Sequence, residues 1–171
     1  MIILDPGHGG KDPGVVDGDV KESEEVLKVA KITKSLLEYK QKEVFLTRSE
    51  DDFVSLKERS RIPNSDDIFV SIHYNGFQDE NAQGVEAFHY PGSKGGKIAT
   101  DIVNNLLEVT DRNFRRVEGN KNFYVVRETR CPAVLIELGF LTNPDERKIV
   151  TSQDYQLKAA MAIAEGVINY D

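Results

Sequence analysis

The chain has 171 residues, of which 39% are hydrophobic and 30% are charged. This length and composition suit one globular domain with its own hydrophobic core, so we expect a single domain over residues 1–171 and exclude a disordered chain. The formal net charge of −7 argues against a nucleic-acid-binding protein, which would carry a basic stripe, and against attraction to anionic lipid headgroups.

The sequence shows no pattern typical of membrane insertion or secretion. No apolar stretch approaches the ~20 residues that a transmembrane helix needs, so we expect no membrane insertion. The apolar residues 1–4 run directly into Asp5 without a basic leader, so we expect no signal peptide in this chain, which leaves the export route open. The single cysteine, Cys131, excludes an internal disulfide framework and a cysteine-rich zinc cluster.

The first half of the chain alternates between apolar runs and helical patterns. Residues 21–40 repeat apolar side chains with helical spacing, and residues 53–62 favour a second helix that stops before Pro63. Residues 5–19 are rich in glycine, proline and aspartate and are expected to form a loop. Buried strands are predicted at residues 1–4, 43–47 and 67–74.

The second half continues this alternation. Strands are predicted at residues 84–90, 123–126 and 133–138, and helices at residues 94–109, 145–150 and 153–169. The apolar spacing of the last helix places Leu157 and Met161 on its core-facing side. Residues 110–122 are expected to form a loop, which is locally basic within an acidic protein. Because strands alternate with helices, the predicted fold class is α/β, with a twisted, mostly parallel or mixed sheet flanked by helices on both faces.

Four side chains that could build a metal site stand at the ends of these elements. His8 follows the first strand, Glu22 opens the next helix, and His73 and Glu137 stand near the carboxyl ends of two buried strands. In open α/β sheets, ligands bind beyond the carboxyl ends of the strands, and helix starts gather at the same edge. We therefore expect these four residues to converge, although they are far apart in sequence.

Two histidines and a glutamate are a common ligand set for catalytic zinc, and a further carboxylate beside them can accept and donate a proton. Each residue also has a simpler structural explanation. His8 could be a loop histidine bonded to the backbone, and Glu22 could be a surface acid stabilised at a helix start. His73 could be a core histidine whose hydrogen bonds are satisfied. Glu137 suits a structural role least, because a carboxylate within an apolar strand is costly without a cation or metal partner. Together the four residues favour a metal site.

Other readings of the same residues fit less well. The glycine-rich residues 7–12 lack the spacing of a phosphate-binding loop, and no G-x-S-x-G elbow supports a serine hydrolase. Cys131 precedes a proline and has no adjacent histidine, so a small buried hydrophobe is favoured over a catalytic thiol. His89 is expected to be an ordinary strand histidine.

An ordered set of motifs runs along nearly the whole chain. It starts with I-I-L-D-P-G-H-G-G-K-D-P-G and continues through K-E, L-T-R, F-V-S-L-K-E-R, F-V-S-I-H-Y-N and G-V-E-A-F-H-Y. It ends with F-Y-V-V-R-E-T-R-C-P-A-V-L-I-E-L-G-F-L-T-N-P and the closing A-I-A-E-G-V. This set resembles the zinc-dependent N-acetylmuramoyl-L-alanine amidases of the amidase-3 family, the type found in bacterial autolysins and phage endolysins.

The resemblance implies that His8, Glu22 and His73 bind Zn2+ and that Glu137 is the catalytic glutamate. It also implies a six-stranded sheet and a hydrolase acting on peptidoglycan, which cleaves the amide bond between N-acetylmuramic acid and L-alanine. Such an enzyme degrades or remodels the cell wall, in an extracellular or periplasmic location. Two departures from the family pattern, Tyr74 and Asn113, are expected near the substrate, where they would affect fine specificity.

Three further residues are candidates for supporting roles. Asn75 and Glu86 could orient the histidines, although a plain structural role at the strand end is an equal alternative for each. Arg127 could bind a stem-peptide carboxylate, and the simpler alternative is a surface ion pair. We expect a monomer without a nucleic-acid partner and without a wall-targeting domain in this chain. The alternatives are a zinc peptidase or deacetylase with similar ligands, and a non-catalytic wall-binding module. The buried Glu137 argues against the wall-binding module, which would not need a catalytic base.

Overall fold

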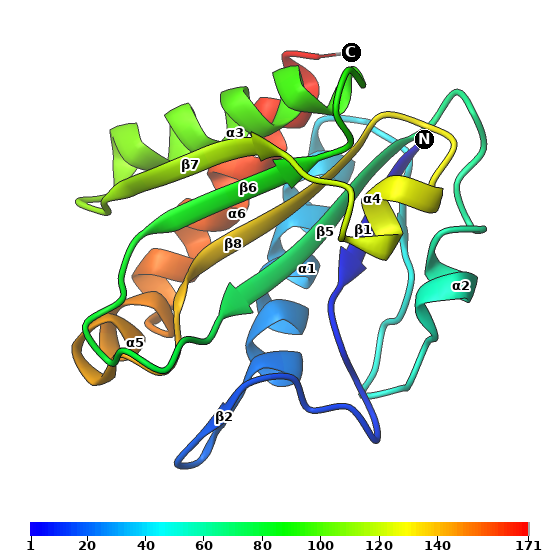
Figure 1. Ribbon diagram of the computed structural model, residues 1–171. Helices are drawn as coiled ribbons and strands as arrows, with labels where there is room; N and C mark the ends of the chain where they lie inside the picture. Colours follow the sequence, from blue (N-terminus) through cyan, green and yellow to red (C-terminus); the bar gives the residue numbers. More distant parts are fainter. Residues whose placement is uncertain (171) are drawn as a thin grey trace.

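The computed structural model describes residues 1–170, which form one six-stranded β-sheet with helices on both of its faces (Figure 1). The strands of this sheet are β1 (Ile2–Pro6), β4 (Val44–Leu46), β5 (Ile68–Asn75), β6 (Val85–His89), β7 (Phe114–Gly119) and β8 (Ala133–Phe140). They lie in the order β4-β1-β5-β8-β6-β7, and only the pair of β6 and β8 is antiparallel. The predicted fold class, a mostly parallel or mixed α/β sheet, is confirmed.

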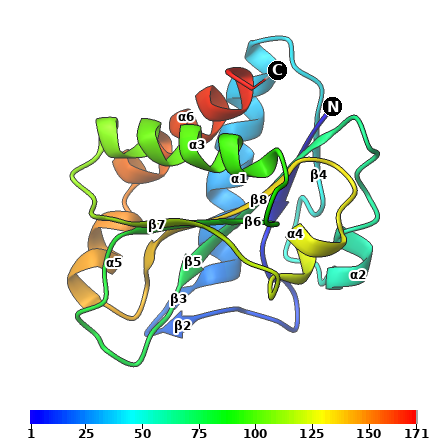
Figure 2. The same ribbon diagram turned by 45° about the horizontal axis from the view of Figure 1, so that its top comes forward.

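The two faces of the sheet are covered unequally. Three long helices pack on one face over the larger hydrophobic core: α1 (Glu22–Tyr39), α3 (Gly95–Val109) and α6 (Gln153–Ile168). The short helix α4 (Tyr124–Glu128) packs over a smaller core on the other face, and α2 (Leu56–Arg59) packs against α4 (Figure 2). Helix α5 (Pro144–Val150) follows β8 and contacts it.

The central strands are buried on both sides, which explains why they read as continuous apolar runs. Every residue of β1 is buried, and its neighbours Ile3 and Leu4 belong to different cores. Side chains alternate between the faces of a strand, and parallel strands covered on both faces therefore lack a polar side. None of the helices within residues 1–170 combines the length and the apolar character needed to cross a membrane.

Two predictions in the late part of the chain are wrong. The predicted strand at residues 123–126 is the start of helix α4, whose Val125 and Val126 are buried together in the smaller core. The predicted loop at residues 110–122 contains β7, the edge strand beside β6. Edge strands are often charged, so F-R-R-V-E-G lacks the apolar alternation by which a strand is recognised in a sequence.

Smaller differences follow from local chemistry. The predicted loop over residues 5–19 contains part of a short hairpin of β2 (Val16–Asp17) and β3 (Val20–Lys21). Helix α2 is shorter than predicted, because a capping box between Ser55 and Glu58 sets its start. In α6, Leu157 and Met161 are 46% and 47% exposed, whereas alanines and Gly166 face the core. A Cβ atom on Gly166 would lie 2.5 Å from Ile102 of α3, so close helix packing selects the small face.

Candidate metal centre

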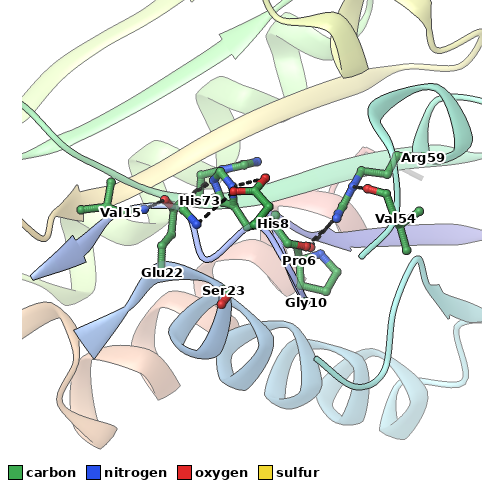
Figure 3. A network of polar contacts seen from close by, with 12 residues as sticks. Pro6, His8, Gly10, Val15, Glu22, Ser23, Val54, Arg59 and His73 are labelled. Atoms are coloured by element: carbon green, nitrogen blue, oxygen red, sulfur yellow. Dashed lines mark hydrogen bonds and ion pairs between the residues drawn. The ribbon is translucent and has the colours of Figure 1, made fainter. Parts of the chain in front are cut away.

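The structure brings His8, Glu22 and His73 together, as the sequence predicts. His8 lies in the loop after β1, Glu22 is the first residue of α1, and His73 lies near the carboxyl end of β5. One ligand atom from each residue can be chosen so that all three lie within 4.8 Å of one another. Figure 3 shows the three side chains pointing toward one another.

Glu22 is the centre of this cluster and is 2% exposed. Its Oε1 lies 3.1 Å from Nε2 of His8 and 2.9 Å from Nδ1 of His73. The backbone amides of Val15 and Tyr74 donate to its two oxygens and fix the carboxylate. Burial alone would raise the pKa of Glu22, but the hydrogen bonds and charges of His73 and His8 outweigh burial and lower this pKa strongly. The carboxylate is therefore ionised at neutral pH.

Asp12 orients His8. The Nδ1 atom of His8 lies 2.9 Å from Oδ2 of Asp12. A carboxylate only accepts hydrogen bonds, so Nδ1 of a neutral His8 carries the proton and Nε2 keeps its lone pair. That lone pair faces Glu22. Burial lowers the pKa of His8, but hydrogen bonds and charges of Glu22 and Asp12 outweigh burial and raise it overall.

Ser71 orients His73 in the same way. The hydroxyl of Ser71 donates to Oδ2 of Asp5 at 2.7 Å, so its oxygen is left to accept from Nε2 of His73, which lies 3.1 Å away. Nδ1 of a neutral His73 then carries the lone pair. In these neutral tautomers both histidines present a lone pair toward the same oxygen of Glu22, whereas a protonated ring donates a hydrogen bond to that oxygen. The cluster therefore holds either protons or a cation between the three groups.

The geometry of these donors fits a small divalent metal ion. Tetrahedral zinc with nitrogen and oxygen ligands at ~2.0–2.1 Å has ligand atoms roughly 3.4 Å apart. The observed separations of 2.9 and 3.1 Å are within a few tenths of an ångström of that value. Two oriented imidazoles and one carboxylate are also a chemically suitable ligand set for zinc.

Two glycines leave room for the cluster. A Cβ atom on Gly7 would lie 2.2 Å from the ring of His73, and one on Gly14 would lie 2.5 Å from Oε2 of Glu22. Any larger residue at either position would displace a candidate ligand. The glycines of the D-P-G-H and K-D-P-G motifs are therefore required by the site itself.

Two buried arginines hold the loop that carries His8, and neither was singled out from the sequence. Arg48 is 4% exposed and donates to backbone carbonyls on both sides of the cluster. Its Nε donates to Pro6, and its Nη2 donates to Gly7 and to Ser23 of α1. Arg48 thus joins the first loop to the start of the helix that provides Glu22.

Arg59 is the second of these arginines and is 3% exposed. Its Nη1 forms a 2.6 Å ion pair with Asp5. Nη1 also donates to the carbonyl of Pro6, and Nη2 donates to the carbonyl of His8; Figure 3 shows Arg59 beside Pro6. His8 has a φ of 59°, in the left-handed region that non-glycine residues rarely adopt. The bond from Arg59 stabilises this unusual backbone and so the position of the imidazole.

A sequence signal for these supporting residues exists within the motifs. Arg48 ends L-T-R, Arg59 ends L-K-E-R, Asp12 lies in K-D-P-G, and Ser71 and Asp5 precede the two histidines in their motifs. Their roles depend on contacts between distant segments, so residue type and spacing alone do not reveal them.

Glu137 lies beside His73, because the two residues are register partners on β8 and β5. Glu137 is 8% exposed, and among the residues that the structure describes its Oε2 has no hydrogen-bond partner. Burial raises the pKa of Glu137 well above its usual range, and the charges of Glu22 and Glu86 raise it further. An unpaired buried carboxylate at this place fits a group that exchanges a proton or faces a cation.

The supporting residues predicted from the sequence have other partners. Asn75 donates from Nδ2 to Oε2 of Glu86 at 2.9 Å, so these two bond each other and not the histidines. Arg127 lies on α4, pairs with the adjacent Glu128 and donates to the carbonyl of Lys121. These contacts do not support a role of Asn75 and Glu86 in orienting the histidines. Arg127 forms a surface ion pair, the simpler of the two alternatives given for it.

A cavity of about 300 Å³ opens beside the cluster. It is lined by both histidines and by apolar side chains, which include Phe53, Leu56 and Val125. Tyr74 was expected near the substrate, but its side chain is 1% exposed and belongs to the larger core on the opposite face. Cys131 is also buried, and burial raises the pKa of its thiol to about 12, so it has no character of a nucleophile.

Comparison with known proteins identifies relatives across the whole chain. Residues 2–169 match the family model described as N-acetylmuramoyl-L-alanine amidase. "Probable cell wall amidase LytH" of Staphylococcus epidermidis is 33% identical over 99% of this chain, which spans only 57% of that relative. The germination-specific N-acetylmuramoyl-L-alanine amidase of Bacillus subtilis is 30% identical, with 99% of this chain and 79% of the relative covered.

Solved structures agree with the sequence relatives. The crystal structure of an N-acetylmuramoyl-L-alanine amidase from Clostridium difficile 630 superimposes with a TM-score of 0.93. The two sequences are 34% identical, and the superposition covers 99% of this chain and 95% of that one. The fold is therefore shared over nearly the full length.

Proposed function

This chain belongs to the N-acetylmuramoyl-L-alanine amidase family, and we propose that it is a zinc-dependent amidase that cleaves peptidoglycan between N-acetylmuramic acid and L-alanine. The observation that carries the zinc assignment is that Nε2 of His8 and Nδ1 of His73 lie 3.1 and 2.9 Å from one oxygen of the buried Glu22. The proposed zinc ligands are His8 through Nε2, His73 through Nδ1, and Glu22.

In the proposed mechanism, the metal would activate the substrate and the water, and Glu137 transfers the proton. Zinc bound at this site would polarise the scissile carbonyl group and acidify the attacking water. Glu137 accepts a proton from that water and delivers it to the alanine nitrogen as the amide bond breaks. The position of Glu137 favours this role, because its register partner is the proposed zinc ligand His73 and its Oε2 has no hydrogen-bond partner among the described residues.

The family relation also supports the setting in which the chain works. We infer a single catalytic domain that acts as a monomer on peptidoglycan, at the cell wall in an extracellular or periplasmic location. The zinc peptidase, deacetylase and wall-binding alternatives share the metal site or the substrate with this proposal. They differ from it in the bond that is broken.

Mass spectrometry of digested peptidoglycan separates these alternatives. The proposal predicts released stem peptides with a new free amino group on L-alanine and glycan strands that stay uncut. Cleavage inside the stem would indicate a peptidase, and released acetate a deacetylase. New reducing ends would indicate a glycosidase, which usually requires two carboxylates astride the sugar linkage. Binding to peptidoglycan without any product would indicate a wall-binding module.

A further inference from the structure

One segment of this acidic chain is basic, and its role is not explained by the metal site. Residues 110–122 contain four basic and two acidic residues, although the whole chain has a net charge of −7. This segment includes β7, which pairs with β6 at the edge of the sheet. Clustered positive charge in an acidic protein indicates a site for an anionic group.

Arg115 and Arg116 extend from β7 toward the candidate centre. Nε of Arg115 lies 2.7 Å and Nε of Arg116 lies 3.2 Å from the same oxygen, Oε1 of Glu86. Glu86 is in turn the register partner of Glu137 on β8. Glu86 thus stands between the two guanidinium groups and the strand that carries the proposed proton acceptor.

The surroundings leave these guanidinium groups able to bind a further anion. Glu86 is 4% exposed, and its single charge faces both arginines. Arg116 has a second acidic neighbour, Glu118, but both side chains are 48% exposed. An exposed pair of this kind is worth only about 0–1 kcal/mol, so a better-placed carboxylate would replace it.

The less covered face of the sheet gives the ligand access. In Figure 1 the long helices α3 and α6 lie behind β8, β6 and β7, while α4 lies in front of one end of these strands only. The apolar cavity lined by Phe53 and Leu56 lies on the other side of the histidines, toward α2. The candidate centre thus has an apolar side and an arginine side.

We propose that Arg115 and Arg116 bind the free α-carboxylate of the second residue of the stem peptide. This inference rests on the proposed amidase function. A stem peptide has D-glutamate at that position, joined through its γ-carboxyl group, and two extended residues place its α-carboxylate roughly 7 Å from the scissile bond. The uncharged glycan offers the arginines no such partner.

The test compares two peptidoglycan preparations that differ only at this group, with either a free α-carboxylate or a carboxamide on the second stem residue. The rate of new alanine amino groups is measured for the wild type and for Arg115→Gln/Arg116→Gln. We expect the wild type to favour the carboxylate form by about three- to tenfold in kcat/KM. The double variant should lose this preference through a higher KM for the carboxylate form.

The matched variant Arg127→Gln removes an exposed arginine of α4 and should keep the wild-type preference. Equal rates on both preparations by the wild type would overturn the inference and leave the amidase proposal standing. A preference that persists in the double variant would also overturn it. New alanine amino groups from neither preparation would contradict the amidase function itself, so the two failures are distinguishable.

Discussion

His73 and Glu137 are register partners on the parallel strands β5 and β8, so their side chains lie side by side on the same face of the sheet. The backbone ladder, and not a loop, fixes the distance between a proposed zinc ligand and the proposed proton acceptor. Sites built on strands hold their geometry more closely than sites built on loops. His8 is the exception, and its loop is held instead by two buried arginines.

Loss of one imidazole should abolish tight metal binding. His73→Ala removes one of three proposed ligands, so protein purified without chelator should contain little zinc, while the wild type contains about one ion per chain. Metal analysis of both proteins checks this. His89→Ala is the matched control, because His89 bonds the carbonyl of Tyr90 and lies outside the cluster. Equal zinc in wild type and His73→Ala would remove His73 from the ligand set.

Glu137→Gln should separate metal binding from catalysis. Glutamine has nearly the same shape as glutamate but cannot accept the proton, so hydrolysis should fall by ~10²–10⁴-fold while zinc content stays unchanged. Steady-state rates and metal analysis of the same sample give both values. Wild-type turnover would exclude Glu137 as the base, and loss of zinc together with activity would make it a ligand.

Zinc affinity should decrease as the pH falls toward 6. The pKa of His8 is raised in the metal-free protein, so folding favours the protonated imidazole. The protonated imidazole stabilises the folded state below pH 6.5, and this stabilisation is lost as the pH rises through the raised pKa. Zinc requires the neutral imidazole, so protons compete with it over that range by about tenfold per pH unit for each proton released. Competition with a chelator at pH 8, 7 and 6 measures the effect. A constant zinc Kd across these values would contradict the assignment of His8.

Arg59→Ala should destabilise the protein strongly. It leaves Asp5 buried without its cation, which typically costs 3–5 kcal/mol, and it frees the carbonyl of His8. Denaturant unfolding measures the change, with Arg61→Ala as an exposed control expected to stay within about 0.5 kcal/mol.

Arg59→Lys tests whether Arg59 also positions the site. Lysine keeps the charge beside Asp5 but cannot reproduce the set of hydrogen bonds from the guanidinium. We expect weaker zinc binding in this variant even at a temperature where it is fully folded. Wild-type zinc affinity in folded Arg59→Lys would reduce the role of Arg59 to stability alone.

The parts of the fold that follow local patterns could be predicted from the sequence. The strand with His73 and the strand with Glu137 are nearly continuous apolar runs, and α1 repeats its buried residues with helical spacing. Their ends place His8, Glu22, His73 and Glu137 at one edge by topology alone. The prediction of a converging cluster therefore needed no knowledge of side-chain contacts.

The parts that depend on long-range contacts could not be predicted. Strand β7 carries charge because it is an edge strand, and its backbone pairs only with β6, so no apolar period marks it. The roles of Arg48 and Arg59 depend on carbonyl groups of distant segments, with separations of 41 positions between Arg48 and Gly7 and 51 positions between Arg59 and His8. The sequence motif points to Arg127 as a substrate-binding residue, but Arg127 pairs with Glu128 on the surface. Arg115 and Arg116, which contact Glu86, have no motif that marks them.

The most direct test of the proposed function is a zinc titration of metal-free protein with peptidoglycan hydrolysis as the readout. Zinc is removed with a chelator, the chelator is removed, and new alanine amino groups are measured after each addition. We expect no hydrolysis before zinc is added and a linear rise that ends at about one ion per chain. Full activity of the metal-free protein, or a rise that continues well beyond one ion per chain, would contradict a single zinc held by His8, Glu22 and His73.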